Sequence, residues 1–258
     1  MQQVIALDFT DLAVCVALMA ITIGLSAWER LGLEYSLGLA SGRTILQLAV
    51  LGYALDSIYK LNNGGAVLAI LAIILTISAI VAKNRITTKI PLVLPLVWGS
   101  MFVSTFLAVF YINTLIIQPE RWFEPRYVIP LAGMVLGGAM NAAALAGERL
   151  VKMVDSSQME IETHLSLGAT PGQAVSQYRK DAIKAGLMPT INQMTLVAMM
   201  TIPGFFSGQL LGDVKPSEAA SYQIIVLFAI AQVNLLTTVL ITRGLSRQFF
   251  NSNAQLIR

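Results

Sequence analysis

Amide side chains and a proline–glycine pair interrupt an apolar stretch between residues 187 and 211, and these groups could hold a polar solute. They are Asn192, Gln193, Pro203, Gly204 and Gln209. An amide both donates and accepts hydrogen bonds, while proline and glycine release backbone groups that neighbours or a water-filled cavity must satisfy. We therefore interpret these residues as the lining of a solute cavity. The alternative is a kinked helix held by interhelical hydrogen bonds.

Three further amides stand in other apolar stretches and are candidates for the same lining: Asn141, Gln232 and Asn234. Carboxylates and histidines are almost lacking in these stretches. Hard ions such as iron or aluminium prefer oxygen ligands, above all carboxylates. We therefore expect no catalytic residue and no metal site. An uncharged, oxygen-rich cavity could instead accept a metal chelate or a polar organic molecule.

Methionine is the residue type that leaves a soft-metal alternative open. Met188, Met194, Met199 and Met200 lie close together in the sequence. Thioethers suit Cu(I), but methionine is also common filler in adaptable packing. The single histidine, His164, stands in a charged segment, and we interpret it as a contact or solvated residue and not as a metal ligand.

The composition is that of an integral membrane protein. Hydrophobic residues make up 56% of the 258 residues and charged residues only 12%, whereas about a quarter of a soluble chain is charged. A spanning helix needs roughly 20 apolar residues. Seven stretches are candidates: 8–28, 43–60, 65–82, 90–117, 127–147, 187–211 and 219–242. Little chain is left over, so we predict one all-α transmembrane domain over residues 1–258.

Basic residues are distributed unequally between the two sides of these seven predicted spans. Thirteen of the 17 lysines and arginines fall on the side of the C-terminus. Cytoplasmic loops carry such an excess. We therefore expect an external N-terminus, a cytosolic C-terminus and a cytosolic segment 148–186. The net charge of +3 reflects this topology and does not indicate a nucleic-acid partner.

The segment 148–186, between the fifth and sixth predicted spans, carries signals of a fixed bend. Gly168 is well placed to end a helix in the left-handed conformation. Thr170 then has the position of an N-cap, with Pro171 at the first helical position and Gln173 completing a capping box. We predict a helix–turn–helix here. An ordinary connector between spans is the alternative.

Two features bear on the source of energy and on assembly. The sequence has no Gly-x-x-x-x-Gly-Lys-Ser/Thr phosphate loop, so we do not expect this chain to bind ATP in that way. The spans also lack the ionisable groups that mark ion-coupled carriers, which favours power supplied from outside the chain. Gly133 and Gly137 form a small-xxx-small pair that could serve either a dimer contact or packing within the chain.

The run from Glu162 to Pro171 resembles the coupling element of ABC transporter permeases, a Glu-Ala-Ala…Gly loop that docks into a groove of the ATPase subunit. Glu162 and Gly168 have the spacing of that motif, whereas Tyr178, Lys180 and Asp181 stand where its Ile-x-Leu-Pro part would be. The resemblance implies that the ATPase-coupling residues are Glu162, Leu165, Leu167, Gly168, Ala169, Thr170 and Pro171.

A longer resemblance covers most of the chain and is specific in its last third, in residues 186–193, 201–209 and 222–224. These runs are similar to iron-export ABC permeases, a family that also includes a plant aluminium-tolerance permease. The resemblance implies a half-transporter of the bacterial inner membrane, surrounded by lipid, that forms a homodimer. It implies a separate ATPase chain that binds ATP and Mg²⁺, and export of a metal ion, a metal chelate or a small polar solute.

Two other classes of protein remain open at this point. A self-contained carrier or channel would move its solute without ATP. A membrane scaffold or receptor-like protein would use the charged segment to bind a partner that is not an ATPase.

Overall fold

The computed structural model describes residues 8–61, 63–86, 90–251 and 253–257, and the regular structure in them is helical apart from two isolated β-bridges. The chain forms two compact units, which are described separately. The first contains α1 (Phe9–Trp28) and α2 (Glu34–Leu61), which contact each other. In the turn between them Arg30 and Gly32 are left-handed, and buried Ser26 donates a hydrogen bond to Glu34 at 3.0 Å. This bond ties the end of α1 to the start of α2.

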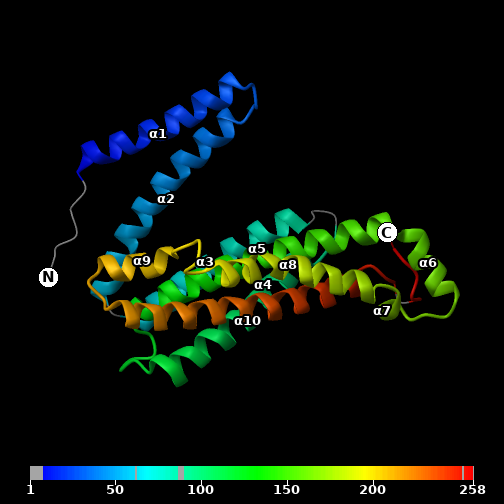
Figure 1. Ribbon diagram of the computed structural model, residues 1–258. Coiled ribbons are helices and arrows are strands. Elements are labelled where there is room, and N and C mark those ends of the chain that lie inside the picture. Colours follow the sequence, from blue (N-terminus) through cyan, green and yellow to red (C-terminus); the bar gives the residue numbers. More distant parts are fainter. Residues whose placement is uncertain (1–7, 62, 87–89, 252, 258) are drawn as a thin grey trace. The chain divides into compact units, whose positions relative to one another are not determined.

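The second unit contains residues 63–210 and 214–258. Its helices are α3 (Gly64–Ile86), α4 (Val93–Tyr111), a π-helix η1 (Ile112–Ile117), α5 (Pro125–Ser156), α6 (Gln158–Ser166), α7 (Pro171–Ala174), α8 (Ser176–Leu196), α9 (Gly204–Leu211, to residue 210 in this unit) and α10 (Pro216–Gln248). Within it α5, α8 and α10 run side by side, with α6 and α7 at one end (Figure 1). Prolines begin α5, α7 and α10, where a missing N–H leaves no helical bond unmade.

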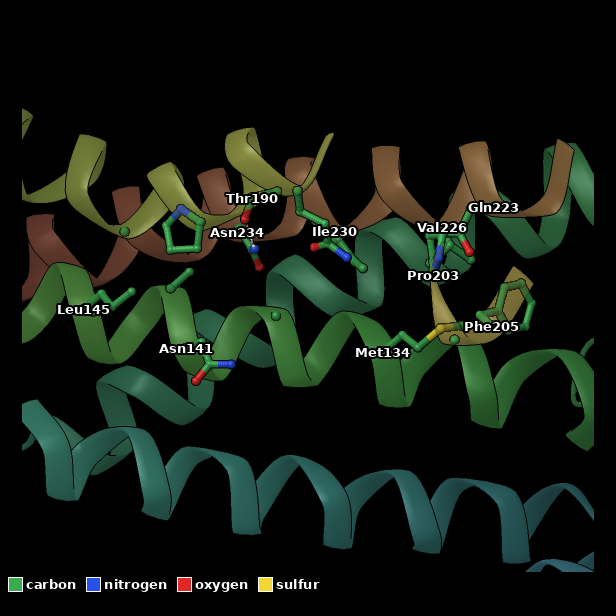
Figure 2. A pocket seen from close by; sticks show the side chains of 16 residues that line it. Met134, Asn141, Leu145, Thr190, Pro203, Phe205, Gln223, Val226, Ile230 and Asn234 are labelled. Carbon is green, nitrogen blue, oxygen red and sulfur yellow. Dashed lines mark hydrogen bonds between the residues drawn. The ribbon is translucent and has the colours of Figure 1, made fainter. Parts of the chain in front are cut away.

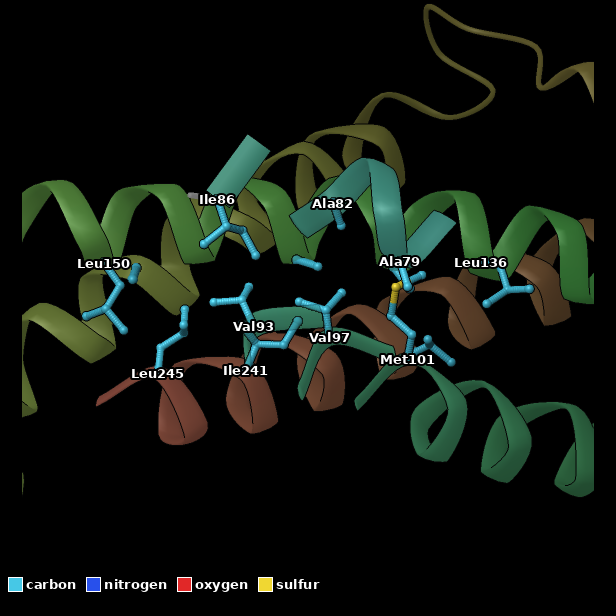
Figure 3. Packing of buried hydrophobic residues seen from close by; sticks show 14 of the residues in the cluster. Ala79, Ala82, Ile86, Val93, Val97, Met101, Leu136, Leu150, Ile241 and Leu245 are labelled. Atoms are coloured by element: carbon cyan, nitrogen blue, oxygen red, sulfur yellow. The ribbon is translucent and has the colours of Figure 1, made fainter. Parts of the chain in front are cut away.

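The core of the second unit lies between α3, α4, α5 and α10 (Figure 3). Met101, Val135, Leu150 and Ile241 are fully buried there. Small residues let the helices approach closely, as membrane helices commonly do. A Cβ built on Gly147 of α5 would lie 2.6 Å from the Ile86 side chain, so a larger residue there would require Ile86 to move.

A polar contact joins two of these core helices. The hydroxyls of Ser104 on α4 and Thr237 on α10 lie 2.6 Å apart, and both residues are completely buried. Such a pair contributes about 0.6 kcal/mol between membrane helices, so it sets the register of the two helices more than their stability.

Five described helical stretches are long and apolar enough to cross a membrane: Thr10–Trp28, Gly64–Ile86, Val93–Ile117, Pro125–Ser156 and Pro216–Gln248. They correspond to five of the seven predicted spans, and the all-helical prediction is confirmed for the described residues. The second predicted span, 43–60, lies inside the longer and more polar α2. The sixth, 187–211, is wrong as one continuous helix, because α8 ends at Leu196 and α9 begins at Gly204.

Candidate functional site

A cavity of about 330 Å³ lies in the second unit between α5, α8 and α10. Figure 2 shows its lining, which the start of α9 completes. The lining residues are Met134, Gly138, Asn141, Ala142, Leu145, Gly186, Pro189, Thr190, Gln193, Pro203, Gly204, Phe205, Gln223, Val226, Ile230 and Asn234. None of these described residues is ionisable, so the wall can offer hydrogen bonds and apolar contact but no formal charge.

Two amides of α10 place buried oxygen atoms at this cavity. Asn234 is 2% exposed and donates a hydrogen bond from Nδ2 to the Thr190 hydroxyl of α8 at 2.7 Å. Its Oδ1 has no hydrogen-bond partner among the described residues, and the same holds for Oε1 of Gln223, which is 6% exposed. Buried side-chain polar atoms are usually paired. These two oxygens are therefore buried, unpaired acceptors in side chains of residues that line the cavity.

Asn141 of α5 occupies a different position in the wall. Its side chain points away from Thr190 and Asn234 in Figure 2. The guanidinium of Arg85, on α3, donates a hydrogen bond to Oδ1 of Asn141 at 3.4 Å. A permanent positive charge therefore stands next to one lining residue of an otherwise uncharged cavity.

The interruption between α8 and α9 contributes Pro203 and Gly204 to the cavity wall. Ala198 is left-handed there, with φ +63°, and its N–H donates to the Thr201 carbonyl at 2.9 Å. A non-glycine residue rarely adopts this conformation. Non-helical backbone at membrane depth is tolerated where it is buried in protein or lines a water-filled cavity. Pro203 lines the cavity within this interruption, and Gly204 lines it as the first residue of α9.

The structure brings together five of the eight residues predicted to line a solute pathway: Asn141, Gln193, Pro203, Gly204 and Asn234. Asn192, Gln209 and Gln232 are not part of this lining. Gln232 is nine residues from Gln223 on α10. That spacing puts it on the opposite side of the helix from the face that lines the cavity. Asn192 is likewise one residue from Gln193 and thus about 100° around α8.

Thr190 and Gln223 are lining residues that the sequence analysis did not select. Gln223 is a polar residue inside the apolar stretch 219–242, the same signal that selected Asn234. The spacing Gln223, Val226, Ile230 and Asn234 follows one helical face, with steps of three, four and four residues. That face could have been found by periodicity once any one of the four was known to line the cavity.

The methionines predicted as a possible soft-metal set do not gather at the cavity. Met199 and Met200 are 83% and 80% exposed, and none of the four is in the lining, which has Met134 instead. Among the described residues no group of three or more His, Cys, Asp or Glu is arranged to hold a metal ion.

The bend between α6 and α8 has the backbone that the sequence predicts. Gly168 has φ +91°, in the left-handed region. The Gln173 N–H donates to the Thr170 hydroxyl at 3.4 Å, and the Thr170 N–H donates to Oε1 of Gln173 at 2.8 Å, which completes the capping box. Both conformational predictions are confirmed. The flanking helices are more broken than predicted, with interruptions at Ser157 and Val175.

The predicted coupling residues divide between the outside and the inside of this bend. Glu162, Leu167, Gly168 and Thr170 are exposed, and Leu167 is 81% exposed. The partly buried residues are Leu165, Ala169 and Pro171, and Leu165 packs against the core. The surface of this segment therefore offers an exposed carboxylate and, five positions later in the chain, an exposed leucine.

A side-chain hydrogen bond joins α6 and α8 across the bend. The Tyr178 hydroxyl of α8 donates to Oε2 of Glu160 on α6 at 2.7 Å. Burial raises the pKa of the Tyr178 hydroxyl, and the hydrogen bond to Glu160 raises it further. The phenol therefore stays protonated at neutral pH and keeps its donor role.

One helix connects this bend to the cavity. α8 begins next to the bend at Ser176 and lines the cavity at Gly186, Pro189, Thr190 and Gln193, about 15 to 25 Å further along at 1.5 Å per residue. At the end of this lining nearest the bend, a Cβ on Gly186 would lie 2.9 Å from the Ala142 carbonyl of α5 and 2.9 Å from Thr238 of α10. At Gly186 α8 thus packs tightly against both neighbouring helices.

Comparison with known proteins agrees with this architecture. The chain is 46% identical over 253 residues to the UPF0014 membrane protein slr1647 of Synechocystis, covering 98% of each chain. It is 33% identical to the probable iron export permease protein FetB of Escherichia coli, covering 96% of this chain and 94% of the relative. It is 30% identical to the protein ALUMINUM SENSITIVE 3 of Arabidopsis thaliana, covering 83% and 77%.

No solved structure matches the chain. The sequence profile described as Uncharacterised protein family (UPF0014) matches residues 9–250, which is nearly the whole length. With its membrane helices and the relatives above, the chain is a membrane protein that belongs to the UPF0014 family.

Proposed function

We propose that this protein is the permease subunit of an ATP-driven ABC exporter, a half-transporter that works with a separate ATPase chain. The observation that carries the proposal is that α8 begins at Ser176, shortly after the Gly168 bend and α7, and runs unbroken to the wall of the cavity. A displacement of the bend by a partner would move Thr190 and Gln193 against α5 and α10, because Gly186 packs α8 on both helices.

The bend has the properties of a docking element. A rigid turn with an exposed carboxylate and an exposed leucine offers a partner both a charge contact and an apolar contact. Fully desolvated apolar contacts near the centre of an interface carry most of its binding energy. The proposed partner surface is therefore centred on Leu167, with Glu162 beside it.

We further propose that two copies of the permease pair in the complex, in the bacterial inner membrane, with the bend on the cytosolic side. One copy has one such bend, and the ATPase subunits of ABC transporters work as pairs. Gly133 and Gly137 support the pairing, because a Cβ at either position would meet nothing within 4 Å among the described residues. A close helix contact within the second unit therefore does not account for these glycines.

The experiment is reconstitution with a candidate ABC ATPase chain. The purified complex should have two permease chains and two ATPase chains by native mass spectrometry, and membrane insertion of the permease alone should leave it without ATP hydrolysis. A solute flux from the permease alone, independent of ATP, would select the carrier or channel alternative and reject this proposal.

A further inference from the structure

We propose that the cavity between α5, α8 and α10 binds an elongated, uncharged solute that donates hydrogen bonds near both of its ends. The inference rests on the proposed function, because it names the class of solute that the permease would carry. It depends on three features of the wall: two separated acceptors, an apolar stretch between them and a cation beside it.

The acceptors are Oε1 of Gln223 and Oδ1 of Asn234, both buried and without a partner among the described residues. An unpaired buried carbonyl destabilises a protein, since it has lost water and gained nothing. A solute with hydroxyl or amide N–H groups would satisfy both atoms. A solute that only accepts hydrogen bonds would satisfy neither of them.

The separation of these acceptors gives the length of the solute. Gln223 and Asn234 are eleven residues apart on α10, which corresponds to about 16 Å along the helix. Val226 and Ile230 lie between them on the same face of α10, and both line the cavity (Figure 2). A volume of about 330 Å³ over that length is narrow. The wall therefore fits a chain-like molecule with an apolar middle.

The charge around the cavity disfavours a bare metal cation as the solute. The lining has no carboxylate among its described residues, and the Arg85 guanidinium is bound to Asn141 in the wall. Hard cations require oxygen ligands that carry charge or several carbonyls in one place. The two free carbonyl oxygens lie too far apart to share one ion.

The first arm of the test measures binding to the purified permease in lipid nanodiscs, without its ATPase. The probe is 1,8-octanediol, which has a donor at each end of an apolar chain. The control probes are 1,8-dimethoxyoctane, which has no donor, 1,4-butanediol, which is too short, and ferrous ion. We expect saturable binding of 1,8-octanediol that is at least tenfold tighter than that of each control probe.

Variants on opposite faces of α10 locate the site. Gln223→Met and Asn234→Leu should each weaken binding of 1,8-octanediol about tenfold or more. Gln232→Met is the matched control, because Gln232 is exposed and half a turn from Gln223. It should bind the diol as the unmodified protein does. Equal loss in all three variants would overturn the assignment.

A second arm needs no ligand. Gln223→Met replaces an unpaired carbonyl by an apolar group of similar shape, so the empty variant should unfold about 2–4 °C above the unmodified protein, whereas Gln232→Met should not shift the midpoint. A lower midpoint for Gln223→Met would show that its amide is structurally paired. A lower midpoint for Gln223→Met would overturn the inference. So would failure of 1,8-octanediol to bind, or binding of the dimethoxy probe or ferrous ion as tight as that of the diol.

Failure of this inference is distinguishable from failure of the proposed function. Binding is measured on the permease alone, and association with the ATPase is measured separately. A permease that binds the diol through Gln223 but never binds an ATPase would reject the exporter and keep the cavity assignment. A permease that binds the ATPase but not the diol would reject the cavity assignment and keep the exporter.

Discussion

The hydroxyl of Tyr178 on α8 donates a hydrogen bond to the Glu160 carboxylate on α6 at 2.7 Å, across the turn that contains Gly168. The two residues are 18 positions apart in sequence. The bond therefore constrains the angle between α6 and α8, which are otherwise joined by the short connecting segment that contains α7. It is accessible to solvent on the Glu160 side. The bond therefore serves geometry more than stability.

Tyr178→Phe should remove this brace at little thermodynamic cost. We expect the free energy of unfolding to fall by less than about 1 kcal/mol, since hydrogen bonds at partly exposed sites contribute little net stability. The stimulation of the ATPase by the permease should fall more than its binding does. Tyr53→Phe, at an 80% exposed tyrosine of α2, is the control and should leave both unchanged.

The same pair predicts a dependence on alkaline pH. The pKa of Tyr178 is raised above its ordinary value of 10.0, first by burial and then by Glu160. A raised pKa in the folded state means that the contribution to stability is complete below about pH 10 and is lost as the pH rises through the folded value. Thermal unfolding from pH 8 to 11 should therefore show an alkaline loss that is smaller in Tyr178→Phe. Identical profiles would rule out this titration.

Gly168→Val tests the bend itself. A β-branched residue at φ +91° is strongly disfavoured, and ordinary L-residues already lose about 1–2 kcal/mol in the left-handed region. We expect normal membrane insertion but loss of ATPase association, read by co-purification. Gly168→Asn is the matched control, since asparagine tolerates this region and a Cβ there meets nothing within 4 Å.

Glu162→Ala should weaken the same association more mildly, by removing one exposed carboxylate. Co-purification and flux that are unchanged in Gly168→Val would mean that the segment only connects two helices. The proposed docking element would then have to be given up.

Gly186→Ala tests the packing of α8 at the end of the cavity nearest the bend. Its new methyl group would lie 2.9 Å from the Ala142 carbonyl, so α8 must move outward. We expect a loss of about 1–3 kcal/mol, as for other overpacked sites, measured as a lower unfolding midpoint. Gly99→Ala on α4, where a Cβ meets nothing within 4 Å, should be close to neutral. Equal midpoints would show that the contact at Gly186 is loose.

The orientation in the membrane is open to direct chemical labelling. In a Cys15→Ser background, a cysteine in place of His164 should react with an impermeant reagent only from the cytosolic side. A cysteine in place of Arg121 should react only from outside. Both replaced residues are exposed, so access is not limited by packing. The opposite pattern would reverse the topology and remove the bend from the reach of an ATPase.

Local features were accessible from the sequence because they depend on a few neighbouring residues. The left-handed Gly168 and the capping box of Thr170 and Gln173 involve backbone groups within four positions. Five membrane helices followed from the length of their apolar stretches. The polar composition of the cavity wall was predicted from amide side chains within apolar stretches, such as Asn234, because a helix that faces only lipid does not need them.

The interruption after Leu196 was beyond such reasoning. Pro203 and Gly204 indicated that the helix is perturbed, but the break begins at Val197, and Ala198 is left-handed without being glycine. A hydrogen bond from Ala198 to Thr201 holds that conformation. Only the surrounding packing could decide where the helix ends, because several nearby positions satisfy the same local rules.

The sequence by itself determined that this is a helical membrane protein with an uncharged, amide-bearing interior and a rigid bend before its sixth apolar stretch. Tertiary structure alone decided which amides line the cavity. Gln223 and Asn234 line the cavity, whereas Gln232 on the same helix does not. The physical reason is that composition and spacing define the faces of a helix, but contact with α5 and α8 selects the face that is enclosed.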